Sequence, residues 1–215
     1  EPVLLAGGVG AFVVTISVLL VPHASLPDDP TAAQVTAFFT EHYTVQQSQT
    51  VMHSLGAIAM LVFFARLASV VRRFERPGES SSLLVLAAAA ALTSVAVVTM
   101  GFVSAAIFLT GDIDGSLQES LYFMGWDFHF KVAYLVPLVL LPACHVLRRE
   151  RAAARTVTWS GLGLGGLALV STVGNLSRDT MFVQYPVFML LLLWVLVAGL
   201  VLGLRGTPDA VPGQA

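Results

Sequence analysis

The amino-acid sequence predicts an all-α membrane protein, a bundle of six transmembrane helices with a short outer interfacial helix. The 215 residues are 56% hydrophobic and only 11% charged, with a mean hydropathy of +0.82. Soluble domains average about 25% charged residues, so this composition is typical of a chain surrounded by lipid. Six apolar stretches are each long enough to cross about 30 Å of hydrocarbon, which takes about 20 helical residues. We place these spans at residues 3–21, 49–71, 83–109, 121–147, 157–176 and 182–204.

Three of the spans have features beyond their length. The apolar run of 3–21 is longer than the 7–15 residues of a signal-peptide core, so we interpret it as a span. In the fourth span, Pro137 and Pro142 predict kinks, because proline lacks the N–H of a helical hydrogen bond. A glycine-rich nucleotide-binding loop follows a β-strand, but no strand is predicted before the glycine-rich run 161–166. We expect it to allow close helix packing instead.

The longest predicted outer loop, residues 22–48, contains a helix of its own. Asp29 followed by Pro30 is typical of an N-cap and a first helical residue. We expect residues 31–42 to form a short interfacial helix over the outer mouth of the bundle. Its apolar side would consist of Val35, Phe38 and Phe39. The alternative is an outward extension of the second span.

Basic residues gather on one side of the predicted membrane. Nine of the eleven lie near the end of the second, fourth and sixth spans or just after it: Arg66, Arg72, Arg73, Arg76, Arg148, Arg149, Arg151, Arg155 and Arg205. Because Lys and Arg favour the cytoplasmic side, we expect a multi-pass protein with both termini in the cytoplasm. The basic residues would also attract membrane lipids with anionic head groups. Residues 207–215 would be a disordered cytoplasmic tail.

Two histidines occupy matching positions in the second and fourth spans. His53 precedes Arg72 by 19 residues, and His129 precedes Arg148 by the same number. At 1.5 Å per residue, each histidine lies about 28 Å from its basic anchor, in the outer leaflet. A glycine one turn away, on the same helix face, would let a partner approach closely. These glycines are Gly56 and Gly125.

Polar residues around the histidines favour an outer-leaflet pocket. Ionisable groups in hydrocarbon cost about 2.5–3.5 kcal/mol each on insertion scales, so such a cluster is a functional-site hypothesis. We predict that His53 and His129 act as acid or base, with Asp127 orienting them or compensating charge. The predicted ligand-binding residues are Gln49, Trp126, Lys131, Tyr134, Asn175 and Arg178.

Several functions remain open. The main hypothesis is a protein that binds a lipophilic small molecule, and as an enzyme would isomerise or cyclise it without a metal or cofactor. The alternatives are a haem b electron-transfer subunit with His53 and His129 as axial ligands, and a non-catalytic partner of another membrane protein. A purely structural role for the histidines is also open. No motif favours binding of nucleic acid.

Three stretches resemble the uncharacterised families of six-span membrane proteins of actinobacteria. LYFMGWDFHFKVAYLVPLVL resembles their fourth span, RTVTWSGLGLGGLALV their glycine-rich fifth span, and FVQYPVFMLLLLWVLVAGLVLGLRG their closing helix. The resemblance implies six helices in the cell membrane of a bacterium. It implies no agreed activity, so no functional residue is transferred from it.

Overall fold

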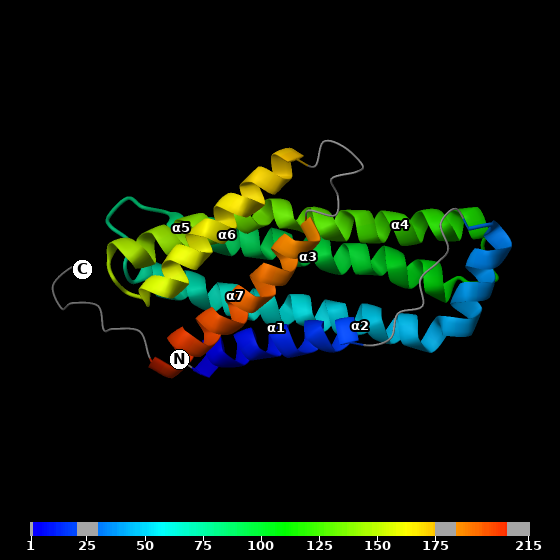
Figure 1. Cartoon of the computed structure of the whole chain (residues 1–215), viewed down its shortest axis with the longest axis horizontal. Helices are drawn as coiled ribbons and strands as arrows, with labels where there is room; N and C mark the ends of the chain where they lie inside the picture. The colour runs from blue at the N-terminus through cyan, green and yellow to red at the C-terminus, as the bar shows by residue number, and fades with distance from the viewer. Residues whose placement is uncertain (1, 21–29, 175–183, 206–215) are drawn as a thin grey trace.

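The computed structural model describes residues 2–20, 30–174 and 184–205, and every regular element in these ranges is helical (Figure 1). In chain order they are α1 (Pro2–Leu20), α2 (Ala32–Arg72), α3 (Ser81–Phe108), α4 (Gly115–Lys131), the 3₁₀ turn η1 (Val132–Leu135), α5 (Val136–Arg149), α6 (Arg155–Gly174) and α7 (Gln184–Arg205). The expected all-α class is therefore confirmed for the described residues. The predicted tail, 207–215, lies outside them.

Four helical segments are long and apolar enough to cross a membrane: Ala32–Arg72, Ser81–Phe108, Val132–Arg149 and Pro186–Leu204. They fit a multi-pass membrane protein. The helices that correspond to the expected first and fifth spans, α1 and α6, are not among these four. In α1 the apolar segment of the described residues is the shorter Pro2–Ser17.

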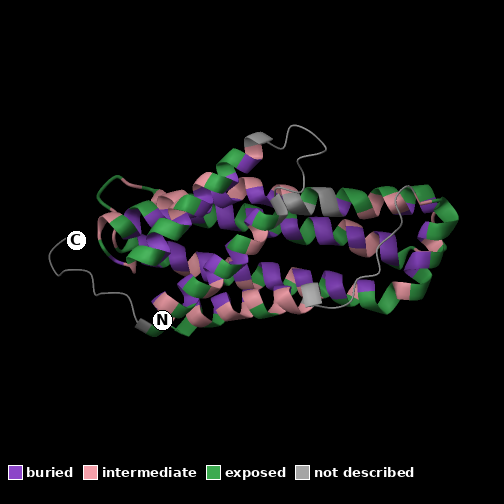
Figure 2. Ribbon diagram, viewed as in Figure 1, coloured by how far each residue is buried: buried purple, intermediate pink, exposed green. Residues whose placement is uncertain are grey.

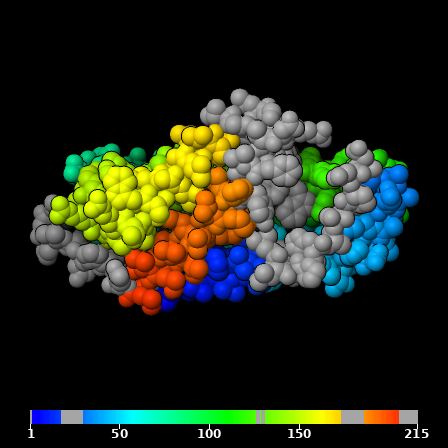
Figure 3. Space-filling view, in the orientation of Figure 1, coloured from blue at the N-terminus to red at the C-terminus, as the bar shows by residue number. Residues whose placement is uncertain are grey.

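The bundle has two unlike halves. Three long units, namely α2, α3 and the series α4–η1–α5, run along most of its length, whereas α1, α6 and α7 flank one half only (Figure 1). Buried segments run through that half (Figure 2). It contains the larger apolar core, whose members include Phe63, Leu92, Leu140 and Leu191. The space-filling view shows α6 and α7 side by side on its surface (Figure 3).

The predicted helix 31–42 is the N-terminal part of α2, and it turns across the end of the bundle at a kink (Figure 1). The kink lies at His42, whose backbone is non-helical (φ −105°, ψ 16°). The apolar side of this part packs on protein, because Phe39 is fully buried with its ring 5.1 Å from that of Tyr122. The structure therefore combines the two alternatives, a separate outer helix and an extension of the second span. Residues 32–72 form one helix, which bends so that its first part packs on α3 and α4.

The predicted N-cap of this helix was wrong. Thr31 caps α2, and Pro30 precedes the cap instead of occupying the first helical position. Thr31 Oγ1 accepts a hydrogen bond from the Gln34 N–H at 3.3 Å, and Gln34 Oε1 accepts one from the Thr31 N–H at 2.8 Å. This reciprocal capping box satisfies two backbone donors at once, which explains why it determines the start of the helix.

The predicted fourth span, 121–147, is divided. Its α-helix is interrupted by η1 and resumes as α5, with Pro137 in the first turn. Since Pro137 has no N–H to offer the Ala133 carbonyl, the N–H of Val136 bonds that carbonyl instead, which is the shorter 3₁₀ pattern. The apolar membrane-crossing segment begins at Val132, so α4 precedes it.

The glycine run 161–166 packs closely at only some of its positions. A Cβ at Gly161 would collide with Cys144 and Trp194, and one at Gly165 would lie 2.8 Å from Leu141. A Cβ at Gly163 or Gly166 would meet nothing within 4 Å. The expected role in helix packing is therefore confirmed at two of the four glycines.

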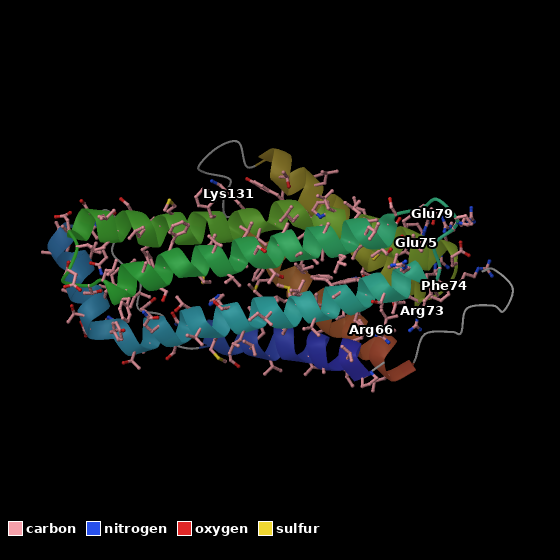
Figure 4. All side chains as sticks on the ribbon, turned by 180° about the vertical axis from the view of Figure 1, so that it is seen from behind. Arg66, Arg73, Phe74, Glu75, Glu79 and Lys131 are labelled. Carbon is pink, nitrogen blue, oxygen red and sulfur yellow. The ribbon has the colours of Figure 1, made fainter. Side chains whose placement is uncertain are left out.

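Ion pairs join the α2–α3 connection to the end of α5 and the start of the α5–α6 connection. Figure 4 labels Phe74 and Glu79 at this end of the bundle. Arg149, at the end of α5, binds both carboxylate oxygens of Glu79 in the α2–α3 connection and donates to the Phe74 carbonyl at 3.3 Å. Its Nε also donates to Glu150 at 2.6 Å. The hydrogen bonds that Glu79 accepts, chiefly from the Arg149 guanidinium and next from the backbone N–H of Arg76, lower the pKa of Glu79 from an ordinary 4.5 to about 2.

Candidate functional site

Buried polar side chains line one side of α2 beyond its kink. Gln46, Gln49, Thr50 and His53, which we call the polar stripe, are each at most 8% exposed. Their spacing of three and four residues puts them on one helix face. Burying a polar group in an apolar interior costs free energy unless it is hydrogen-bonded. The hydrogen-bond partners of these side chains therefore determine whether the polar stripe stabilises or destabilises the fold.

The imidazole of His53 is oriented by its own helix. Its Nδ1 lies 3.0 Å from the Gln49 carbonyl oxygen. Because a carbonyl oxygen can only accept, Nδ1 is the nitrogen that bears the proton, and Nε2 is the acceptor nitrogen of the neutral ring. Both Gln49 and His53 take part in further contacts. The ring is thus set in the tautomer that suits a base or a metal ligand at Nε2.

The other members of the polar stripe differ in their partners. The hydroxyl of Thr50 donates to the Gln47 carbonyl at 2.8 Å. Gln46 is only 4% exposed, and its side chain makes no hydrogen bond within the described part of the chain. A buried amide without partners is uncommon and requires an explanation.

A reciprocal pair of hydrogen bonds fixes α2 against α3 beside the polar stripe. Gln47 Nε2 donates to the Ser104 carbonyl at 3.3 Å, and the Ser104 hydroxyl donates to Gln47 Oε1 at 3.1 Å. About three turns farther along α2, the Thr93 hydroxyl reaches the Ala57 carbonyl at 3.4 Å. Between these contacts, position 53 lies at about the level of residue 97 of α3.

The same helix α3 also sets the level of α4. Gly125 approaches α3 so closely that a Cβ there would lie 2.8 Å from the Thr99 carbonyl oxygen and 3.1 Å from the Val103 nitrogen. Four residues later, position 129 therefore lies at about the level of residue 97 as well. Positions 53 and 129 therefore lie at a similar level along α3. They belong to α2 and α4, the helices that precede and follow α3 in the chain and pack against it.

The structure describes only part of the predicted site. Positions 126, 127 and 129 are helical residues of α4, but the side chains of Trp126, Asp127 and His129 lie outside what the structure describes. Asn175 and Arg178 lie outside the described residues altogether.

Two predicted ligand-binding residues, Lys131 and Tyr134, are half-buried around the junction of α4 and η1. Lys131 lies far from the arginine-rich end in Figure 4, and its Nζ is 5.2 Å from the centre of the Phe128 ring. This distance is that of a cation–π contact. The ring of Phe128 thus lies next to the ammonium group of Lys131, a charge that we predicted to lie within the hydrocarbon.

Sequence reasoning missed Gln118, which is fully buried near the start of α4. Its amide donates to the Ala106 carbonyl at 2.8 Å and to the Thr110 hydroxyl at 2.7 Å, and it accepts from Thr36 at 3.4 Å. It therefore joins α4 to α3 and to the first part of α2. No spacing signal in the surrounding polar sequence distinguishes Gln118 from its exposed neighbours.

Two cavities lined by described residues lie away from the polar stripe. One, of about 640 Å³, lies between the end of α5 and the start of α6, and four of its eight lining residues are arginines. The other is a groove of about 440 Å³ between α6 and α7, with Leu164, Leu167 and Leu193 among its apolar walls. Neither is lined by a residue of the predicted site.

The chain matches no protein-family model, no curated protein and no solved structure. Within the described ranges, no three His, Cys, Asp or Glu side chains are grouped as a metal ion would require. Function must therefore be inferred from the geometry of the polar stripe itself.

Proposed function

We propose that the protein binds a lipophilic small molecule whose polar group docks on the polar stripe. The observation that carries the proposal is the Gln46 amide, which is buried without a hydrogen bond in the described part of the chain. A ligand carbonyl or hydroxyl would satisfy this amide, while the surrounding apolar helices hold the hydrocarbon skeleton.

The proposed setting is a bacterial cell membrane crossed by six helices, with α1 and α6 completing the set. The helical lengths of α1 and α6, 19 and 20 residues, support this, since about 20 residues cross the hydrocarbon. The arginines at one end would face the cytoplasm together with both termini. The polar stripe would then lie in the outer leaflet.

In an enzyme, His53 would move a proton within the ligand. Its acceptor Nε2 would take a proton from one carbon of the ligand, and the resulting imidazolium would return it at another. No proton, electron or group is gained or lost overall, so isomerisation or cyclisation needs no co-reactant. Asp127 would stabilise the imidazolium, and His129 would serve as the second acid or base.

Binding is tested with Gln46→Leu and the matched control Gln47→Leu in the purified protein. In protein freed of lipophile, Leu at 46 removes an unsatisfied amide and should raise the melting temperature. As isolated, this variant should contain at least fivefold less co-purified lipophile than the wild type. Leu at 47 breaks the bonds to Ser104, so it should lower the melting temperature. If Gln46→Leu retains the wild-type amount of lipophile, the binding proposal is wrong.

The acid–base role is tested by His53→Gln beside His42→Gln. The two histidines share the same local bond, because His42 Nδ1 lies 3.0 Å from the Phe38 carbonyl. Only the variant at His53 should lose turnover of the extracted lipophile, by a factor of about 10²–10⁴. Equal turnover in both variants would refute the role.

A second candidate function is haem ligation by His53 and His129, which their similar depth along α3 favours. A metal-ligating histidine usually donates its other N–H to a carbonyl or carboxylate, as His53 does to Gln49. An optical spectrum, recorded as isolated and after dithionite reduction, distinguishes the candidates. A Soret band that shifts on reduction and is lost in both His53→Ala and His129→Ala supports haem. A colourless sample from cells supplied with haem refutes it.

A further inference from the structure

The cavity between α5 and α6 is rich in positive charge that the described acidic residues do not neutralise. Arg149, at its edge, is bound to Glu79 and Glu150. Arg151 and Arg155 also line the cavity, and neither forms an ion pair within the described part of the chain. Both are exposed. An anion in this cavity could therefore bind the guanidinium groups of Arg151 and Arg155 without first displacing a carboxylate from them.

An aromatic ring holds another arginine at the mouth of the same cavity. The guanidinium carbon of Arg148 lies 4.7 Å from the centre of the Trp159 ring, which is a cation–π contact. Trp159 is 50% exposed although it is a large apolar side chain. Tryptophan is enriched where the hydrocarbon of a bilayer meets water, so this ring marks the level of lipid head groups.

The conformation of Arg151 is unusual for its residue type. The N–H of Arg151 bonds the Arg148 carbonyl at 3.2 Å and the N–H of Ala152 bonds the Leu147 carbonyl at 2.9 Å, which forms a Schellman motif at the end of α5. The residue at the left-handed position of this motif is usually glycine, but here it is Arg151, with φ 54°. A strained residue with a charged side chain in a cavity indicates a role for that charge.

The cavity is also placed where a membrane lipid can reach it. It lies where the apolar segment Val132–Arg149 ends, at the same end of the bundle as the α2–α3 connection (Figure 1). Farther along α6, Leu169 and Val170 are exposed on the outside of the bundle, as acyl chains would favour. Amphiphiles whose phosphate lies at the cavity would thus keep their tails against apolar surface.

We propose that this cavity is a binding site for the phosphate of an anionic membrane lipid. Arg148, Arg151 and Arg155 surround the phosphate, and the N-terminal end of α6 adds its partial positive charge. The site lies at the end of the bundle where α2 ends, whereas the polar stripe lies near the middle of that helix. It does not depend on the function proposed there.

The test is native mass spectrometry of the full chain in mild detergent, titrated with dioleoyl phosphatidylglycerol or dioleoyl phosphatidylcholine. One phosphatidylglycerol should bind saturably at concentrations where phosphatidylcholine does not. Arg155→Gln should weaken this binding about fivefold, which corresponds to about 1 kcal/mol for a basic residue near an anionic surface. Arg72→Gln, an exposed arginine outside the cavity, is the matched control and should have little effect.

Arg151→Gly separates binding from folding. Glycine adopts the left-handed conformation without strain, so this variant should melt at a higher temperature yet bind phosphatidylglycerol about fivefold more weakly. Unchanged binding in Arg151→Gly and Arg155→Gln, or an equal loss in Arg72→Gln, would overturn the proposal. Displacement of the lipid by glycerol 3-phosphate at equal affinity would identify a soluble phosphate as the ligand and overturn the lipid assignment.

Discussion

Gly161 is the position at which the packing of α5, α6 and α7 can be tested most directly. A Cβ there would collide with the sulfur of Cys144 in α5 and would lie 2.9 Å from Trp194 Nε1 in α7. Neither neighbour can retreat easily. Cys144 is buried, and the Trp194 indole donates to the Val157 carbonyl at 3.0 Å. We therefore expect Gly161→Ala to separate these three helices.

The magnitude follows from two opposing terms. Overpacking a core by one methyl group costs about 1–3 kcal/mol, and two rigid neighbours place Gly161→Ala in the upper part of that range. Alanine regains up to about 1 kcal/mol of helix propensity. A net loss of about 1–2 kcal/mol lowers the melting temperature of a chain of this size by about 2–8 °C.

Two further variants make the assay decisive. Gly163→Ala is the same substitution in the same helix, but its Cβ would meet nothing within 4 Å, so it should leave the melting temperature unchanged or raise it. In a Cys144→Ala background, Gly161→Ala should cost at least about 1 kcal/mol less, because the colliding sulfur is gone. If Gly161→Ala and Gly163→Ala melt alike, or if Cys144→Ala gives no relief, the packing explanation is refuted.

Two more predictions concern the ends of the bundle. The pKa of Glu79 is about 2 in the folded protein and 4.5 ordinarily, so its stabilising effect is complete above pH 4.5 and is lost as the pH falls from there toward 2. The melting temperature of Glu79→Gln should depend less on pH in that window, whereas Glu41→Gln, an exposed control, should keep the wild-type dependence. Thr31→Ala removes the cap of α2, which is worth about 1 kcal/mol, and should speed amide exchange in residues 32–42. Thr40→Ala, an exposed site within the same segment, should not, and similar exchange in both variants would contradict the capping role.

The helices could be predicted because lipid leaves the chain few choices. An apolar stretch of about 20 residues in hydrocarbon must satisfy its backbone hydrogen bonds internally, and a helix does so. The break near Pro137 was equally predictable, since a missing N–H has a local consequence. The start of α2 was harder, because Asp29 and Thr31 are both good caps and the reciprocal bond with Gln34 decided between them.

Burial could not be predicted in the same way. Val35, Phe38 and Phe39 share a face that would suit either lipid or protein, and the kink at His42 decided that they pack on α3 and α4. Gln46 and Gln47 are neighbours of the same type, yet one is buried without partners in the described part and the other pairs with Ser104. Which side of a helix meets a neighbour depends on the position of that neighbour.

The sequence by itself determined the class of the protein, the approximate extent of its helices, the equal spacing of His53 and His129 from their arginines, and the gathering of basic residues at one end. Each follows from composition or from distances along one helix. Tertiary structure alone decided that Gln46 is enclosed, that Arg149 binds Glu79, and that the arginines after α5 surround a cavity. Those features depend on contacts between segments far apart in the chain, and apolar helices can pack on one another in many ways until specific contacts choose among them.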